Sequence, residues 1–324
     1  MPSLLEIERL TVQFHTEEST VHAINGVDMV VPVGKAIAIV GESGSGKSTT
    51  MMAVPKLLPT NADVGGRIIF KEKNILSMSS KEIRTIRGKE IAMIFQNPSA
   101  FLNPIKKIGE QLIEPVLYHH LASKESATRR AIELLQNVGI PDAEARFHMY
   151  PFEFSGGMLQ RAMIAMALMA DPLLLIADEP TTGLDVTVQS EILILLKKLQ
   201  LERGMSMVFI THDLAVAAQV SDEIYVMYGG LVMEHIRAEQ LVTHSTHPYL
   251  KGLLASIPKL DGPRERLSYI PGQPINTNQP LAAGCVFADR CDMKMEQCGA
   301  RPQLSTLDEG HEVACWRVQE GVRA

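Results

Sequence analysis

The chain has 324 residues, of which 46% are hydrophobic and 21% are charged, and its formal net charge is −6. This composition is typical of a globular protein with one large domain and a smaller appendage, and the acidic balance argues against nucleic acid as a partner. The N-terminus lacks the basic start and apolar core of a signal peptide, and the longest apolar runs are too short for a membrane span. We therefore expect a soluble, cytoplasmic chain that reaches a membrane only by docking on other subunits.

The N-terminal part of the chain is rich in predicted strands. β-Branched residues in partial alternation indicate the first two strands, and a continuously apolar run indicates a third that is buried on both faces. A glycine-rich loop and a helix from about residue 47 follow this third strand. The strands predicted in this part are residues 5–14, 21–31, 36–40, 66–70 and 91–95.

The middle of the chain changes to a helical pattern. Helical spacing over residues 125–138 is stopped by Gly139 and Pro141. A second helix is predicted over residues 158–170. We expect these helices to belong to a helical insertion over about residues 98–170.

Short buried strands return after the insertion. Residues 173–177 and 207–210 are predicted as strands on either side of a helix over about 186–202, and residues 223–235 are predicted as a hairpin. The alternation of short apolar strands with helices predicts an α/β fold with a mostly parallel sheet. After about residue 245, repeated prolines and four cysteines indicate a small Cys-rich C-terminal appendage.

The glycine-rich loop at residues 41–48, GESGSGKS, fits the phosphate-binding P-loop pattern. In such a loop the backbone N–H groups and the N-terminus of the following helix bind phosphate oxygens. We expect Lys47 to contact the β- and γ-phosphates and Ser48 to bind Mg²⁺. A chance glycine-rich turn is the alternative, and the position between a buried strand and a helix argues against it. The predicted ATP contacts of this loop are Gly41, Ser43, Gly44, Ser45, Gly46, Lys47, Ser48 and Thr49.

Polar residues follow three of the other predicted strands. Asp178 ends an apolar strand, where a carboxylate associated with Mg²⁺ belongs, and Glu179 suits a general base for the attacking water. Gln96 is a candidate ligand of Mg²⁺ or water, and His212 is a candidate hydrogen-bond partner of the γ-phosphate. Taken alone, a glutamine or histidine at the end of a strand is more often a surface or structural residue.

A second candidate anion site lies farther along the chain. Ser155, Gly156 and Gly157 precede a predicted helix, and a serine with two glycines at a helix N-terminus suits phosphate. One chain therefore carries two phosphate-binding elements, which suggests a head-to-tail pair of such domains with two nucleotides between them. Asp185 is expected near the contact between the two domains.

The order and spacing of these motifs resemble the ATP-binding cassette (ABC) family over roughly residues 4–240. This resemblance implies a P-loop NTPase domain with a mixed, mostly parallel sheet core, an antiparallel β subdomain and a helical insertion. We accordingly divide the chain into an ATP-binding domain at residues 1–245 and a C-terminal extension at 246–324. The resemblance assigns residues 41–48 to Walker A, Gln96 to the Q-loop, residues 154–158 to the signature, Asp178 and Glu179 to Walker B and the catalytic glutamate, Asp185 to the D-loop and His212 to the switch histidine.

The chain departs from the family pattern in its signature, and the residue that stacks on adenine has two candidates. The signature reads FSGGM in place of LSGGQ, and we expect Met158 to slow the site that this signature completes, while phosphate contact survives. Phe14 matches the aromatic residue that stacks on adenine. The stretch after Phe14 is long, so His22 is the alternative.

The four cysteines, Cys285, Cys291, Cys298 and Cys315, are separated by five, six and sixteen residues. Structural zinc prefers paired CxxC knuckles, whereas four thiolates are also the complete ligand set of an iron–sulfur cluster. We expect an iron–sulfur cluster, with zinc or free thiols as alternatives. The segment HPYLKGLLASIP and the cysteines after it resemble the oligopeptide/dipeptide/nickel branch of ABC importer ATPases, which implies a four-iron, four-sulfur cluster here in a structural or regulatory role.

The resemblance implies an ATPase at the cytoplasmic face of the inner membrane, attached peripherally. Its partners would be a second, non-identical ATPase, two transmembrane permease subunits and an extracytoplasmic solute-binding protein, with residues 97–112 contacting the permeases. Di- or oligopeptides are the first expectation for the cargo, and nickel or another small solute is the second. The alternatives are a soluble ABC ATPase acting in translation or DNA repair and an inactive regulatory cassette. Intact Lys47, Asp178, Glu179 and His212 argue against an inactive cassette.

Overall fold

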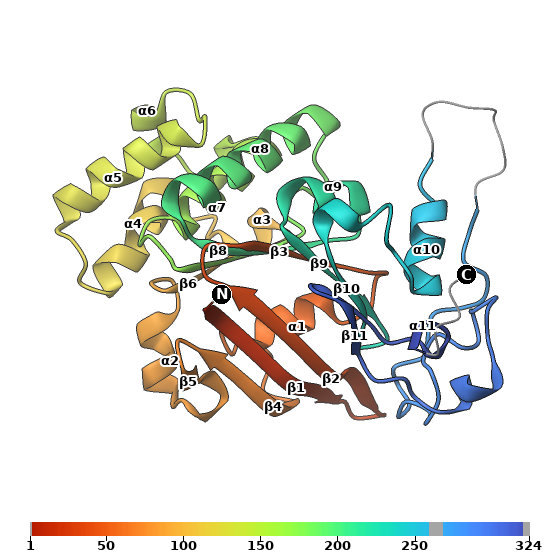
Figure 1. Cartoon of the computed structure of the whole chain (residues 1–324). Helices are drawn as coiled ribbons and strands as arrows, with labels where there is room; N and C mark the ends of the chain where they lie inside the picture. Colours follow the sequence, from red (N-terminus) through yellow and green to blue (C-terminus); the bar gives the residue numbers. More distant parts are fainter. Residues whose placement is uncertain (1, 259–267, 320–324) are drawn as a thin grey trace. The chain divides into compact units, whose positions relative to one another are not determined.

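Figure 1 shows the computed structural model, which describes residues 2–258 and 268–319. By their internal contacts the residues form two units that are interleaved along the chain. The first unit comprises Met1–Leu4, Val31–Ala36 and Ser77–Ile210, and the second comprises Leu5–Val30, Ile37–Leu76 and Thr211–Ala324. Within the described ranges, no helix is both long enough and apolar enough to span a membrane.

The first unit contains a parallel sheet with the strand order β6-β7-β8. These strands are β6 (Ile91–Ile94), β7 (Leu174–Asp178) and β8 (Ser206–Thr211). Every residue of β7 and β8 is buried, as expected for parallel strands that are covered on both faces. The short, continuously apolar runs were therefore correctly interpreted as buried strands.

The helical part of the first unit packs around α7. Helix α4 contacts α5, α6 and α7, and α5 also contacts α6 and α7 (Figure 1). Ser123 starts α5 by accepting a hydrogen bond from the backbone N–H of Ser126. Gly109 lets α4 approach Phe147, because a Cβ at this position would overlap the ring. The helical elements of this unit are α2 (Ser80–Ile86), α3 (Pro98–Phe101), α4 (Ile108–Tyr118), α5 (Lys124–Asn137), α6 (Ala143–Phe147), the 3-10 turn η2 (Pro151–Glu153), α7 (Gly156–Ala167) and α8 (Val186–Arg203).

The second unit contains an antiparallel sheet with the strand order β2-β1-β4-β5. Strands β1 and β4 pair with Leu5 opposite Phe70 and Phe14 opposite Ala62, and the register shifts between Glu8 and Thr11. The strand predicted at residues 66–70 begins earlier, because residues 62–65 also pair with β1. The strands of this sheet are β1 (Ser3–His15), β2 (Thr20–Pro32), β4 (Ala62–Phe70) and β5 (Lys73–Asn74).

The other strands of the second unit belong to a mixed sheet with the order β3-β9-β10-β12-β11. Strand β3 is parallel to β9, whereas the β9–β10 hairpin and the two C-terminal strands are antiparallel. Strands β11 and β12 were not predicted, because segments of three or four residues carry too little periodicity to be recognised. These strands are β3 (Ala36–Val40), β9 (Glu223–Tyr228), β10 (Leu231–Arg237), β11 (Ser305–Asp308) and β12 (His311–Val313).

The helical elements of the second unit are short. Helix α1 follows β3, α9 follows β8 and α10 follows the hairpin (Figure 1). Together with the 3-10 turns they are α1 (Lys47–Ala53), η1 (Ile75–Ser77), α9 (Leu214–Val220), η3 (Ala238–Gln240), α10 (Pro248–Ala255), η4 (Glu296–Gly299) and α11 (Trp316–Gln319).

A histidine between two carboxylates links β9, β10 and β12. His235 lies 3.1 Å from Glu223 through Nε2 and 3.2 Å from Glu312 through Nδ1, and its ring stacks on Tyr225 with the ring centroids 4.1 Å apart. Burial lowers the pKa of His235, but the hydrogen bonds and charges of the two carboxylates outweigh burial and raise it. The histidine is therefore protonated more readily in the folded chain than in the unfolded chain.

Replacing His235 with glutamine is expected to destabilise the protein more at pH 6 than at pH 9. A raised folded-state pKa gives a stabilisation that is fully present below the ordinary pKa of imidazole and is lost as the pH rises through the folded-state value. The difference in the free energy of unfolding between the variant and the wild type, measured by urea denaturation, should shrink by about 1 kcal/mol across this range. His244→Gln, on an exposed side chain, is the control. A difference that does not depend on pH would contradict the charged contact.

Candidate functional site

The glycine-rich loop connects β3 to α1 in the second unit and has a backbone that only glycine readily adopts. Gly41, Gly44 and Gly46 have φ angles of 152°, 79° and 100°. A Cβ at Gly41 would collide with the carbonyl oxygen of Met227, and a Cβ at Gly46 would lie 2.9 Å from the carbonyl oxygen of Ala23. The sequence pattern therefore reflects both the left-handed turns and the close packing of this loop.

The loop carries a buried ammonium and a buried hydroxyl group, both of which suit a phosphate ligand. The Lys47 ammonium donates to the carbonyl oxygens of Gly41 and Glu42 at 2.9 and 3.0 Å. The Ser45 hydroxyl is buried and has no hydrogen-bond partner among the described residues. Because buried hydroxyl groups are normally bonded, an unpartnered one in a loop of this kind fits a phosphate ligand. Ser43 and Gly44 are exposed at the tip of the loop, and Ser48 and Thr49 are partly buried in α1.

The other predicted residues of the second unit are Phe14 and His212. Phe14 is half-buried in β1, opposite Ala62. His212 is exposed directly after β8. The turn that carries it is held by Asp213, whose backbone N–H donates to Thr211 Oγ1 at 3.0 Å and whose carboxylate caps α9.

In the first unit, the structure brings Gln96 and Glu179 together. Gln96 Nε2 and the hydroxyl of Thr182 both donate to Glu179 Oε2, at 3.0 and 2.9 Å. Asp178, the last residue of β7, is buried next to Glu179 in the chain. Two neutral donors thus orient the Glu179 carboxylate. The sequence analysis predicted Gln96 only as a ligand of Mg²⁺ or water, and it did not predict Thr182.

Glu179 also has a strained backbone. Its φ angle is 43°, in the left-handed region that non-glycine residues rarely adopt. The strain is held by a hydrogen bond from its backbone N–H to the carbonyl oxygen of Ile210 on β8, at 3.0 Å. Strained residues of this kind cluster at active sites, where the surrounding structure fixes the direction of a reactive side chain.

Two helix N-termini meet elsewhere in the first unit. Ser155 caps α7 by accepting from the N–H of Met158 at 3.3 Å, and Asp185 caps α8 by accepting from the N–H of Val188 at 3.0 Å. A Cβ at Gly157 would lie 3.0 Å from a methyl group of Val188, so the glycine allows the two helix starts to approach. Ser155 and Gly156 are exposed, which leaves this end of α7 open to a partner.

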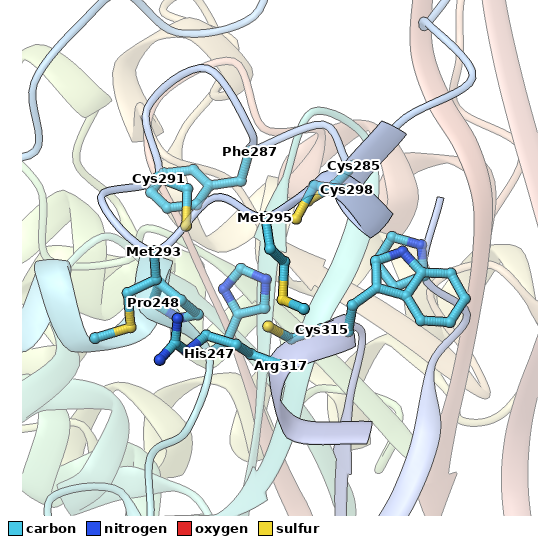
Figure 2. A pocket seen from close by; sticks show the side chains of 12 residues that line it. His247, Pro248, Cys285, Phe287, Cys291, Met293, Met295, Cys298, Cys315 and Arg317 are labelled. Atoms are coloured by element: carbon cyan, nitrogen blue, oxygen red, sulfur yellow. The ribbon is translucent and has the colours of Figure 1, made fainter. Parts of the chain in front are cut away.

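All four cysteines line one small cavity in the C-terminal region (Figure 2). Phe287, Met293 and Met295 give the cavity an apolar wall. Burial raises the pKa of the thiols of Cys285, Cys291 and Cys315, that of Cys291 to about 11. Among residues 2–258 and 268–319, no group of three or more His, Cys, Asp or Glu side chains is arranged as a metal site. The thiols therefore share a cavity without forming a preorganised ligand set.

His247 lines the same cavity and begins α10. Burial lowers its pKa to about 4, so the ring is neutral near pH 7. Its Nδ1 accepts a hydrogen bond from the backbone N–H of Tyr249 at 3.0 Å. The polar string THSTHP predicts a solvent-exposed turn at His247. This prediction is wrong, because the side chain is buried and caps a helix in the C-terminal region.

Three residues around the phosphate loop were not predicted, namely Glu42, Tyr249 and Arg290. Glu42 donates its backbone N–H to the Tyr249 hydroxyl at 3.0 Å, and its carboxylate pairs with Arg290. These contacts join residues more than 200 positions apart. The only sequence signal is the position of Tyr249 in the HPY string.

Comparison with known proteins identifies the class of this chain. Residues 24–182 match the ABC transporter family, and residues 233–298 match the oligopeptide/dipeptide transporter C-terminal region. A dimeric ATP-binding cassette solved in a post-hydrolysis state with ADP and Pi superposes with a TM-score of 0.65 and 29% identity, covering 72% of this chain and 98% of that one. The chain is therefore an ATPase of the ABC transporter family, with that family's P-loop fold of mixed sheets and helices.

Relatives of similar length narrow this assignment. The chain is 46% identical over 320 residues to the oligopeptide transport ATP-binding protein OppD of Haemophilus influenzae, covering 99% of both chains. It is 45% identical over 319 residues to the dipeptide transport ATP-binding protein DppD of Bacillus subtilis, covering 98% of this chain and 95% of that one. The chain belongs to the oligopeptide/dipeptide branch of the ABC transporter ATP-binding proteins.

Replacing Glu179 with glutamine is expected to preserve MgATP binding and to lower ATP hydrolysis by about 100-fold or more. The amide keeps the shape of the side chain but cannot take a proton from the attacking water. Nucleotide affinity by calorimetry and phosphate release should be measured on the same preparation. Glu202→Gln, which changes an exposed carboxylate paired with Lys198 on α8, is the matched control. Normal turnover in the Glu179 variant would contradict its assignment as the general base.

Proposed function

We propose that this chain is the ATP-hydrolysing subunit of an importer of di- or oligopeptides. The single observation that supports hydrolysis best is the Glu179 carboxylate, held by Gln96 and Thr182 at the end of a buried strand. The peptide cargo is inferred from relatives named as oligopeptide and dipeptide transport proteins, which this chain matches over 98–99% of its length.

The proposed ATP site uses the motif residues in defined roles. The backbone of residues 41–46 and the Lys47 ammonium bind the phosphates, and Phe14 stacks on adenine, with His22 as the alternative. Thr49 completes the phosphate contacts at the start of α1. Ser48, Gln96 and Asp178 would hold Mg²⁺, which when bound neutralises charge on the β- and γ-phosphates.

Hydrolysis proceeds by attack of water on the γ-phosphorus. Glu179 orients the water and accepts its proton as the new P–O bond forms, while the bond from the γ-phosphorus to the bridging oxygen breaks and the electron pair leaves on ADP. His212 hydrogen-bonds the γ-phosphate. The products are ADP and inorganic phosphate, and Glu179 returns the proton to solvent.

We further propose that the site is shared with a second, non-identical ATPase subunit. Ser155, Gly156 and Gly157 would bind the γ-phosphate of ATP held by the partner, with Asp185 beside them at the contact. The exposure of Ser155 and Gly156 at the start of α7 supports this role, because the N–H groups there can reach a ligand outside the chain.

The other proposed partners are two transmembrane permeases and an extracytoplasmic solute-binding protein. Phe101 and Ile105, 56% and 83% exposed, supply an apolar contact for a permease within residues 97–112. The Phe101 ring stacks on Phe95, next to Gln96, with the centroids 3.8 Å apart. The chain would lie at the cytoplasmic face of the inner membrane, attached peripherally, with residues 1–245 as the ATP-binding domain and 246–324 as the extension.

The cysteine cavity is proposed to hold a four-iron, four-sulfur cluster, with zinc as the alternative. Four thiols and an apolar wall fit a thiolate-bound group chemically. Cys285, Cys291, Cys298 and Cys315 would be the ligands. Because burial favours the protonated thiols, binding would release protons and should weaken at low pH. When bound, the cluster would cross-link the segments that carry the cysteines.

The transport proposal is tested by uptake in a strain that lacks the gene. The wild-type chain should restore uptake of labelled di- or oligopeptides, and Lys47→Ala should not, because the phosphate-binding ammonium is gone. In vitro, ATPase activity should rise when the permeases and the second ATPase are added. Nickel uptake without peptide uptake would show that the cargo is nickel and not a peptide. Stimulation of the ATPase activity by RNA or DNA, and not by the permeases, would overturn the transport proposal.

The cluster proposal is tested by iron and acid-labile sulfide content after purification without oxygen. About four of each per chain and a broad absorbance band at roughly 400 nm are expected. Each of the four cysteine-to-serine variants should lose iron, whereas Met293→Leu, which changes the wall of the same cavity, should retain it. Zinc in place of iron would establish the alternative, and absence of both metals would show free thiols.

A further inference from the structure

A side chain from the cysteine-bearing segment binds the phosphate loop directly. Arg290, the residue before Cys291, donates through Nη1 to Glu42 Oε2 at 2.7 Å and through Nη2 to Glu42 Oε1 at 3.0 Å. Glu42 is the second residue of the GESGSGKS loop. Two parallel charge-assisted hydrogen bonds of this kind fix the orientation of both groups as well as their distance.

The guanidinium is almost fully enclosed and all of its nitrogens are bonded. Its side chain is 6% exposed, against 25% for Glu42. Nε donates to the carbonyl oxygen of Pro271 at 3.0 Å, and the group lies over the ring of Tyr228 at 5.6 Å from the centroid. The arginine is thus held by the C-terminal region on one side and holds the phosphate loop on the other.

Glu42 is also fixed along its backbone. Its N–H donates to the Tyr249 hydroxyl at 3.0 Å, and its carbonyl oxygen accepts from Lys47 Nζ at 3.0 Å and from the N–H of Ser45 at 3.2 Å. Tyr249 comes from α10, so two C-terminal elements contact the same loop residue. The position of this part of the loop depends on residues far along the chain.

The same contacts lead to the cysteine cavity. Phe287, in the cavity wall, packs against Tyr228 and Tyr249 with ring centroids 5.5 and 5.3 Å away. The backbone N–H of Arg290 donates to the carbonyl oxygen of Phe287 at 3.0 Å. The arginine and the cavity wall therefore belong to one packed turn.

We propose that Arg290 is a positioning residue for nucleotide binding, which through Glu42 holds the phosphate loop in its binding conformation and makes ATP affinity depend on the folded cysteine-bearing segment. The inference rests on the proposed ATP site at residues 41–48.

Loss of the arginine has two effects on this loop. The loop loses a restraint, so part of the cost of ordering it falls on nucleotide binding. Glu42 also becomes an unpaired carboxylate beside the site where phosphates bind, and like charges repel. Both effects weaken MgATP binding, and only the second is removed when Glu42 is neutralised.

The test is a set of MgATP affinities for the full chain, measured by calorimetry in Arg290 and Glu42 variants. Arg290→Met should raise the Kd by about tenfold, and Arg290→Lys, which keeps the charge but not the two-pronged geometry, by about threefold. Adding Glu42→Gln to Arg290→Met should partly restore affinity, because it removes the uncompensated charge. The KM for ATP should rise while kcat at saturating ATP changes by less than about twofold.

Lys294→Gln is the matched control, since it removes another cation of the same segment, one whose pair with Asp289 is 3.1 Å long and exposed on both sides. It should bind MgATP as the wild type does. Melting temperatures without nucleotide identify any variant that fails to fold, in which case Arg290→Lys and Glu42→Gln decide the question. The inference would be overturned if a folded Arg290→Met chain bound MgATP with wild-type affinity. It would also be overturned if the double variant lost as much MgATP affinity as the Arg290→Met and Glu42→Gln single variants lose together. A wild-type chain that binds no MgATP would instead overturn the proposed ATP site.

Discussion

Close approach of backbone to backbone at the phosphate loop is the constraint on which the second unit depends. Gly41 and Gly46 leave no room for a Cβ beside Met227 and Ala23. A Cβ at Gly230, in the β9–β10 turn, would lie even closer to the Ala23 carbonyl oxygen, at 2.4 Å. Glycines at these points allow the loop, the end of β9 and strand β2 to pack together. The loop can then present its N–H groups to phosphate from a rigid base, which lowers the ordering cost of binding.

Sequence patterns predicted the local structure well and the distant contacts poorly. The buried strands and the loop were recognisable because each has a composition of its own. The four cysteines line one cavity in the structure, and their role as ligands stays a prediction. The pairing of Glu42 with Arg290 joins residues 248 positions apart. Glu42 lies in the phosphate-loop motif, but Arg290 belongs to no motif, so no sequence pattern links the two. His247 was misjudged for the same reason, since its burial depends on segments that meet only in the folded chain.

In the first unit, the backbone strain at Glu179 is the cost of placing a carboxylate in the active site. Glu179 has a backbone conformation that suits glycine, yet a glycine there would remove the carboxylate. The hydrogen bonds from Gln96 and Thr182 direct that carboxylate, and the bond from its N–H to Ile210 holds the strained turn. Conformational strain of order 1–3 kcal/mol is therefore retained at the position where the reaction needs a directed base.

The pairing of β12 with β10 has a consequence for any shortened form of the chain. Val232, Met233 and Ile236 of β10 are buried, and the carbonyl oxygen of Met233 accepts from the N–H of Ala314 at 2.9 Å just beyond β12. Proteolysis that removed the C-terminal strands would leave β10 as an open, apolar edge. Such edges recruit strands from other molecules, so a clipped subunit would tend to self-associate, and cells that degrade the clipped form quickly would avoid aggregates of it.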